Sequence, residues 1–146
     1  FLAHFNYSNL ATIAAVNLAD IIEHANMGSL PLLLVFVLVT GVVNLIIPAA
    51  IAKWAILAPI FVPLFMKLNV PPDLVLAAYR VGDSPGNCIT PLMAYFGMIV
   101  IFVQKYQKDA GVGTVVAMML PYTVALYVIW TVFLVLWYLL GLPFGL

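Results

Sequence analysis

Long apolar runs, interrupted at only a few places, dominate this chain and predict membrane-spanning helices. The charged residues leave three uncharged windows, over 25–52, 84–104 and 110–146. Each window can hold the roughly 20 apolar residues that cross a hydrocarbon core of about 30 Å. The pattern therefore predicts an all-α integral membrane protein.

The first half of the chain predicts two elements. Residues 1–27 mix apolar and polar side chains, which predicts an amphipathic, partly buried helix. Residues 28–68 predict one discontinuous transmembrane helix, broken near 44–50 where Asn44 and Pro48 interrupt the apolar run.

The second half predicts a hairpin and one long span. Residues 69–106 predict a re-entrant helical hairpin with its tip at 83–87, because its first arm, over 72–82, is too short to cross a bilayer. Residues 107–146 predict a C-terminal transmembrane helix. A chain with so few spans that starts inside an apolar segment is expected to be the C-terminal fragment of a larger integral membrane protein.

Composition narrows the class of protein further. Hydrophobic residues make up 66% of the chain and charged residues 7%, whereas soluble domains average about 25% charged residues. The formal net charge is zero and no basic stripe exists to bind phosphates, so nucleic acid is excluded as a partner and the lipid bilayer is expected. The single cysteine, Cys88, cannot form an intrachain disulfide.

Three polar clusters fall inside apolar surroundings and are the candidates for function. They are Asn44 through Trp54, Arg80 with Asp83, and Ser84 through Thr90. Polar groups at membrane depth are costly, and irregular backbone is tolerated there only beside protein or water. Two broken segments in one chain are the best sequence indication of a secondary transporter's binding site.

Each cluster also has a purely structural interpretation. Arg80 and Asp83, three residues apart on a helix, could form a buried ion pair that neutralises itself. Lys53 is expected to extend its ammonium group to the membrane interface. Trp54 in such a position is more often an interfacial anchor than a stacking platform.

Three separated blocks between residues 52 and 122 resemble a known family. They are AKWAILAPIFVP at 52–63, AYRVGDS at 78–84 followed by Asn87 and Thr90-Pro91, and DAGVGT at 109–114 followed by MLPY at 119–122. Together they resemble the C-terminal portion of the AbgT family of p-aminobenzoyl-glutamate transporters. The resemblance implies a multi-pass homodimer of the bacterial inner membrane with nine spans and two re-entrant hairpins, whose N-terminal half is missing from this chain.

The resemblance also implies a function and the residues that perform it. Family members are secondary active transporters that take up p-aminobenzoyl-glutamate or export sulfonamide antimetabolites, and a proton or sodium gradient would drive them. Positions that the family uses along its substrate path fall on Trp54, Pro72, Arg80, Asp83 and Pro91. A family sodium site falls on Asn44, Asp83 and Asn87, and sodium is the only bound cofactor implied.

Two positions depart from the family pattern. Ile51 stands where the family usually has a serine, and the predicted tip contains Pro85-Gly86 where the family commonly has Val-Thr. The second change removes a backbone donor and a hydroxyl group.

Other functions remain open at this point. A sodium-coupled carboxylate or dicarboxylate symporter would share the hairpin and the broken helix but not the Lys-Trp block. A channel would differ from a carrier by its much faster flux. An intramembrane enzyme would need a nucleophile with a base or paired acids, and the spacing of residues suggests neither.

Overall fold

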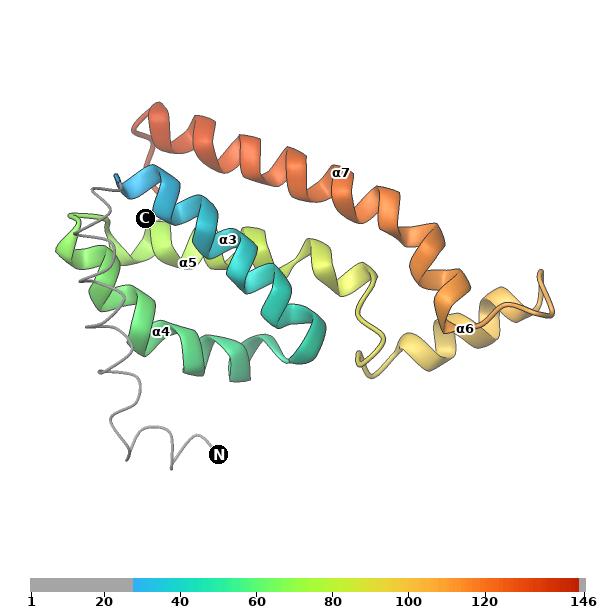
Figure 1. Ribbon diagram of the computed structural model, residues 1–146. Coiled ribbons are helices and arrows are strands. Elements are labelled where there is room, and N and C mark those ends of the chain that lie inside the picture. The colour runs from blue at the N-terminus through green and yellow to red at the C-terminus, as the bar shows by residue number, and fades with distance from the viewer. Residues whose placement is uncertain (1–27, 145–146) are drawn as a thin grey trace.

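The computed structural model describes residues 28–144, and all its regular elements in that range are helical (Figure 1). In chain order they are α3 (Ser29–Ile46), α4 (Ala50–Lys67), α5 (Pro72–Asp83), the 3-10 helix η1 (Pro85–Cys88), α6 (Phe96–Gln104) and α7 (Val112–Leu139). The predicted all-α membrane fold is confirmed. The amphipathic helix expected over 1–27 lies outside the described residues.

Three of these helices are long and apolar enough to cross a membrane: α3, α4 and α7. The 18 residues of α3 and of α4 extend over about 27 Å at 1.5 Å per residue. The 28 residues of α7 exceed the core thickness, and Figure 1 shows this helix bending in its first third. Pro121 lies in that third and cannot donate a helical hydrogen bond.

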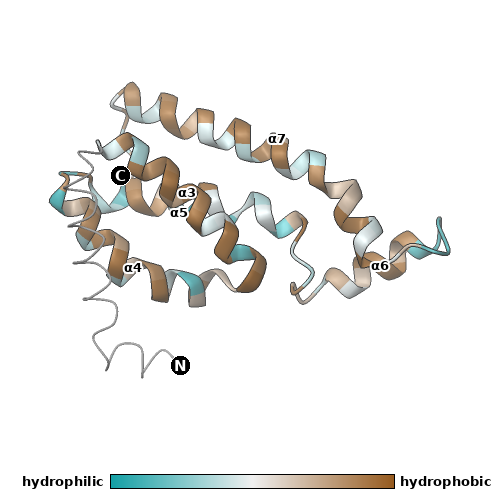
Figure 2. Cartoon of the chain, viewed as in Figure 1, coloured by the Kyte–Doolittle hydropathy of each residue, from teal (hydrophilic) through white to brown (hydrophobic). Residues whose placement is uncertain are grey.

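The core forms where α3, α4 and α5 pack together. The ring of Phe36 lies 4.5 Å from that of Phe61 and 5.6 Å from that of Phe65, measured between centroids. Leu74 and Val75 from α5 are also fully buried there. α7 is apolar along most of its length yet largely exposed (Figure 2), as expected of a surface that meets lipid or other membrane helices.

The first difference from the sequence-based expectation concerns residues 28–68. They form two helices, not one discontinuous helix, because the backbone is extended at Ile47 and Ala49 and α4 then runs back past α3 (Figure 1). Pro48 explains the separation: it disfavours helical backbone at Ile47 and provides no N–H group of its own. The interruption thus lies between two membrane-capable helices.

The second difference concerns the hairpin. α5 pairs with α4 and not with α6: Trp54 near the start of α4 contacts Tyr79 near the end of α5, which makes the two helices antiparallel. The turn between them contains Asn69, whose φ of 57° is left-handed. After Asp83 the chain continues through η1 into α6 without folding back on α5 (Figure 1). The chain therefore reverses at 68–71, and residues 84–95, where the tip was expected, are a break between α5 and α6.

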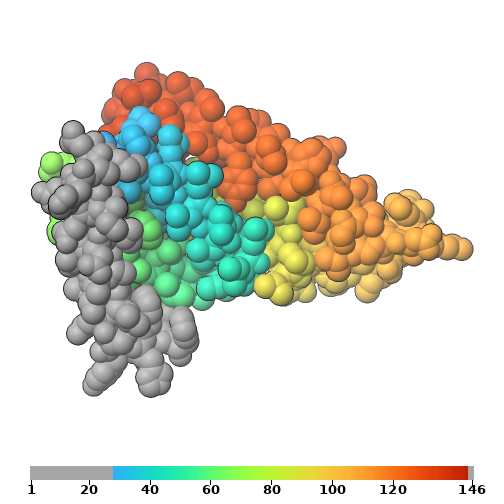
Figure 3. Space-filling model, in the orientation of Figure 1, coloured from blue at the N-terminus to red at the C-terminus, as the bar shows by residue number. Residues whose placement is uncertain are grey.

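The long helix α7 holds that break in place. It packs against α5 and η1, and the hydroxyl group of Tyr127 donates a hydrogen bond of 2.8 Å to the carbonyl group of Gly82. In the space-filling view α7 lies along α3 and over the residues of the break (Figure 3). The C-terminal span predicted over 107–146 is present as α7.

Candidate functional site

The ends of three helices meet around one lysine side chain. Asn44 lies in the last turn of α3, Lys53 in the first turn of α4, and Asp83 is the last residue of α5. Asn87 follows in η1. We call these four residues the polar centre.

Lys53 and Asp83 form a buried ion pair at the polar centre. The ammonium group of Lys53 donates hydrogen bonds to Asp83 Oδ1 and to Asn44 Oδ1. The two charged side chains are 0% and 3% exposed. A charge buried to this degree is stable only with a partner, so each of the two charges depends on the other.

Asn44 connects the ion pair to the break that follows α5. Its Nδ2 donates one hydrogen bond to the main-chain oxygen of Asp83 at 3.0 Å and another to Asn87 Oδ1 at 3.1 Å. The last carbonyl groups of a helix have no partner within the helix, so Asn44 satisfies one at the end of α5. Asn44, Asp83 and Asn87, which the sequence analysis grouped, therefore lie together.

Two glycines allow the chain segments to approach closely here. A Cβ atom on Gly82 would lie 2.5 Å from the carbonyl oxygen of Val37, and one on Gly86 would lie 2.5 Å from Asn44 Nδ2. Neither glycine has a positive φ, so each is needed for space and not for its backbone freedom. The departure from the family pattern at Gly86 thus gives Asn44 its room.

A second group of side chains lies next to the polar centre on α4 and α5. The rings of Trp54 and Tyr79 are 4.8 Å apart, and the guanidinium carbon of Arg80 is 5.9 Å from the centroid of the Tyr79 ring. The Tyr79 hydroxyl group donates a 2.6 Å hydrogen bond to the carbonyl group of Ala50. Trp54 and Arg80 are therefore both held against one buried tyrosine.

The structure corrects two of the structural interpretations. Lys53 does not extend to the interface, because its side chain is fully buried and paired with Asp83. Arg80 is exposed, and within residues 28–144 Asp83 has Lys53 as its ionic partner and not Arg80. The guanidinium group of Arg80 is thus available to a ligand.

The two candidate prolines lie apart from the polar centre. Pro72 begins α5 at the end opposite Asp83, beside the turn to α4, and it is exposed. Pro91 is exposed in the segment between η1 and α6. The structure therefore brings Trp54, Arg80 and Asp83 into one region and leaves the two prolines outside it.

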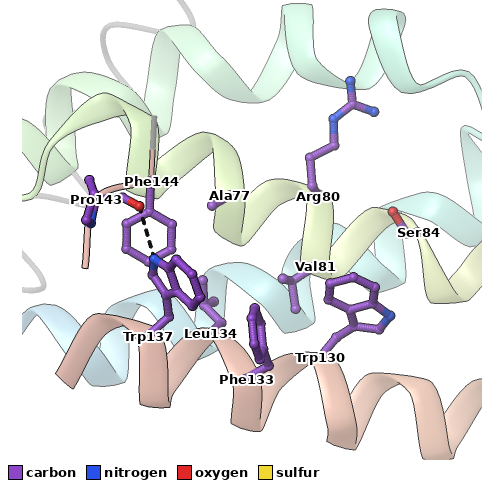
Figure 4. Close-up of a pocket in the computed structure, with 10 residues that line it drawn as sticks. All are labelled: Ala77, Arg80, Val81, Ser84, Trp130, Phe133, Leu134, Trp137, Pro143 and Phe144. Atoms are coloured by element: carbon purple, nitrogen blue, oxygen red, sulfur yellow. Dashed lines mark hydrogen bonds between the residues drawn. The ribbon is translucent and has the colours of Figure 1, made fainter. Parts of the chain in front are cut away.

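An apolar pocket of about 340 Å³ lies on the other side of α5 (Figure 4). Trp130, Phe133 and Trp137 of α7 line it, facing residues of α5. Figure 4 shows the guanidinium group of Arg80 pointing away from these rings, so that only the stem of Arg80 borders the pocket. Arg80 consequently separates two aromatic surfaces, one at Trp54 and Tyr79 and the other on α7.

Sequence reasoning gave no role to Tyr79 or Tyr127, and it misplaced Lys53. Tyr79 directly precedes Arg80 in the AYRVGDS block, but nothing in its spacing shows that it contacts Trp54. Tyr127 lies in the middle of the mostly apolar helix α7, and its only signal was a hydroxyl group that needs a partner.

Known proteins resemble this chain in sequence and in structure. The family model described as "AbgT putative transporter family" matches residues 1–146. The p-aminobenzoyl-glutamate transport protein of Escherichia coli (strain K12) is 37% identical over 145 residues.

Two solved structures share the fold. The YdaH transporter of Alcanivorax borkumensis superposes with a TM-score of 0.88 and 46% identity over 99% of this chain. MtrF of Neisseria gonorrhoeae belongs to a class of antimetabolite efflux pumps. It superposes with a TM-score of 0.79 and 43% identity over 92% of this chain.

The chain spans only part of each of these proteins: 28% of the E. coli protein, 31% of YdaH and 27% of MtrF. AbgT family members are inner-membrane proteins, in agreement with the three membrane-capable helices described above. Because the family model matches the whole chain, and sequence and fold agree, the chain belongs to the AbgT transporter family.

Proposed function

We propose that this chain forms part of a secondary active transporter that moves p-aminobenzoyl-glutamate, sulfonamide antimetabolites or both across the bacterial inner membrane. A proton or sodium gradient drives the movement, and the transporter works as a homodimer. The names of the E. coli relative and of MtrF support this choice of substrates.

The placement of both Trp54 and Arg80 against Tyr79 is the observation that carries this proposal. A guanidinium group presents a planar fork of donors to paired oxygens, such as those of a carboxylate or a sulfonyl group. An indole ring offers its face to an aromatic ring. Both substrate classes combine an aromatic ring with such oxygens, which lie on the ring's sulfonyl group in sulfonamides and on the glutamate portion of p-aminobenzoyl-glutamate, so one site can accept both.

The polar centre gives ion coupling a structural basis. Lys53 precedes Trp54 directly, and Asp83 lies one turn after Arg80 on α5. A change in the ion pair therefore moves the same two helices that carry the substrate-binding side chains. In this arrangement substrate and ion act on one another through α4 and α5.

Counterflow in proteoliposomes tests the transport function. Vesicles containing the protein should accumulate labelled p-aminobenzoyl-glutamate and a labelled sulfonamide, each competing with the other. Proton and sodium gradients imposed separately should identify the driving ion. Accumulation of simple dicarboxylates with no response to either aromatic compound would instead favour the carboxylate symporter.

Arg80 is the only arginine in the chain, and Arg80→Lys is expected to weaken substrate binding about tenfold or more. Lysine keeps the charge but loses the paired donors, and a hydrogen bond to a charged group contributes about 1.5–3 kcal/mol. Equilibrium binding of labelled substrate to purified protein measures the change. Lys67→Arg, at the exposed end of α4, is the control and should leave affinity unaltered. Wild-type affinity in Arg80→Lys would show that only charge matters.

Trp54→Phe should bind substrate nearly as well as the wild type, whereas Trp54→Ala should bind about three- to tenfold more weakly. Aromatic pairs contribute about 0.5–1.5 kcal/mol beyond their buried area, and phenylalanine retains most of that. Trp130→Phe and Trp130→Ala serve as controls, because Trp130 lines the pocket on the other side of α5. If Trp130→Ala loses affinity and Trp54→Ala does not, the substrate ring binds in the α7 pocket.

A further inference from the structure

As these residues are arranged, most oxygens that a sodium ion would need at the polar centre already accept hydrogen bonds from the protein. Sodium prefers several oxygen ligands, and the expected ones are the side-chain oxygens of Asn44, Asp83 and Asn87 with nearby carbonyl groups. Asn44 Oδ1 and Asp83 Oδ1 already accept hydrogen bonds from Lys53. Asn87 Oδ1 and the main-chain oxygen of Asp83 accept hydrogen bonds from Asn44 Nδ2. Each expected ligand residue is thus engaged by a donor of the protein.

The balance of charge leads to the same conclusion. Lys53 and Asp83 together are neutral, and both are almost completely buried. A sodium ion added to the pair would leave one uncompensated positive charge in a region that disfavours it. Without the ammonium group of Lys53, the same ion would neutralise Asp83.

We propose that the ammonium group of Lys53 is a cation tethered to the protein that competes with sodium for the oxygens of Asn44 and Asp83. Sodium and Lys53 then exclude one another from the polar centre. An ion can bind there only after the lysine side chain has withdrawn, and this lowers the apparent sodium affinity of the wild-type protein. The proposal concerns ion binding alone and does not depend on which substrate is transported.

Sodium binding to Lys53→Met tests this competition directly. Methionine keeps an unbranched side chain of similar length and removes the charge. Binding of labelled sodium is measured on the detergent-purified protein that carries this chain, at one pH, with choline chloride holding ionic strength constant. We expect Lys53→Met to bind sodium at least about tenfold more tightly than the wild type, because a neighbouring positive charge is removed from a buried site. Lys67→Met, on the exposed end of the same helix, should bind sodium as the wild type does.

Stability supplies a readout that does not require tight binding. Lys53→Met should melt at a higher temperature in sodium chloride than in choline chloride, since an ion that binds only the folded state stabilises it. The double variant Lys53→Met/Asp83→Asn should show no such difference, which places the effect at Asp83. If Lys53→Met folds only when sodium is present throughout purification, that outcome also supports the competition.

Three outcomes would overturn the proposal. The first is equal sodium affinity in the wild type and Lys53→Met. The second is sodium stabilisation of Lys53→Met that persists in the double variant. The third is failure of Lys53→Met to fold in sodium and choline alike, because an unpaired Asp83 beside Asn44 should then accept the ion.

Discussion

Asp83→Ala is expected to destabilise the protein by about 3–5 kcal/mol, which is the usual effect of removing one partner from a buried ion pair. The alanine leaves the ammonium group of Lys53 buried with Asn44 as its remaining partner. The loss should appear as a lower free energy of unfolding in mixed micelles containing a denaturing detergent. Transport should fall with it, since the ends of α3, α4 and α5 are no longer held together.

Two further variants separate the ion pair from a general effect of substitution. Lys53→Met/Asp83→Leu should recover most of the lost stability, because hydrophobic replacement of both partners is often neutral while loss of one is not. Asp73→Ala, on the exposed first turn of the same helix, should change stability little. If the double variant is as unstable as the sum of the single ones, the charges do not interact.

The helices were predictable from the sequence because their causes are local. Apolar length, together with the prolines at 48, 71 and 72, indicated where α3, α4 and α5 begin or end. The pairing of helices was not predictable, because it depends on which break reverses the chain. Gly86 suggested a turn at 83–87, yet its φ is not positive, and Asn69 makes the reversal instead.

Part of the polar centre was also predictable, because some of its residues are recognisable from the local sequence. The three polar clusters stood out against apolar surroundings, and the structure brings Asn44, Asp83 and Asn87 together. Their link to Lys53 was missed, because a lysine near a helix start gives no indication of its depth in the membrane. Asp83 has a cationic residue three positions away on its own helix, but it pairs with one thirty residues distant, an outcome decided by how α4 packs on α5.

Gly82→Ala should disrupt the packing of α5 on α3, at an expected loss of about 1–3 kcal/mol. The added Cβ atom would lie 2.5 Å from the carbonyl oxygen of Val37 and 2.8 Å from the Cβ atom of Thr40. The carbonyl belongs to the backbone of a buried helix and cannot rotate away, so α5 must shift. Because Asp83 is the next residue, the shift also strains the ion pair, and both the melting temperature and substrate counterflow should fall.

Gly97→Ala is the matched control, since a Cβ atom there meets nothing within 4 Å. Alanine favours a helix interior over glycine by about 0.8–1.0 kcal/mol. Gly97 is the second residue of α6 and Gly82 the next to last of α5, so each position gains only part of that difference. Only at Gly82 does the steric conflict with α3 exceed that gain, so the two variants should differ in the sign of their effect on stability. If Gly82→Ala is as stable as Gly97→Ala and transports normally, the close approach of α5 to α3 is not required for the polar centre to form.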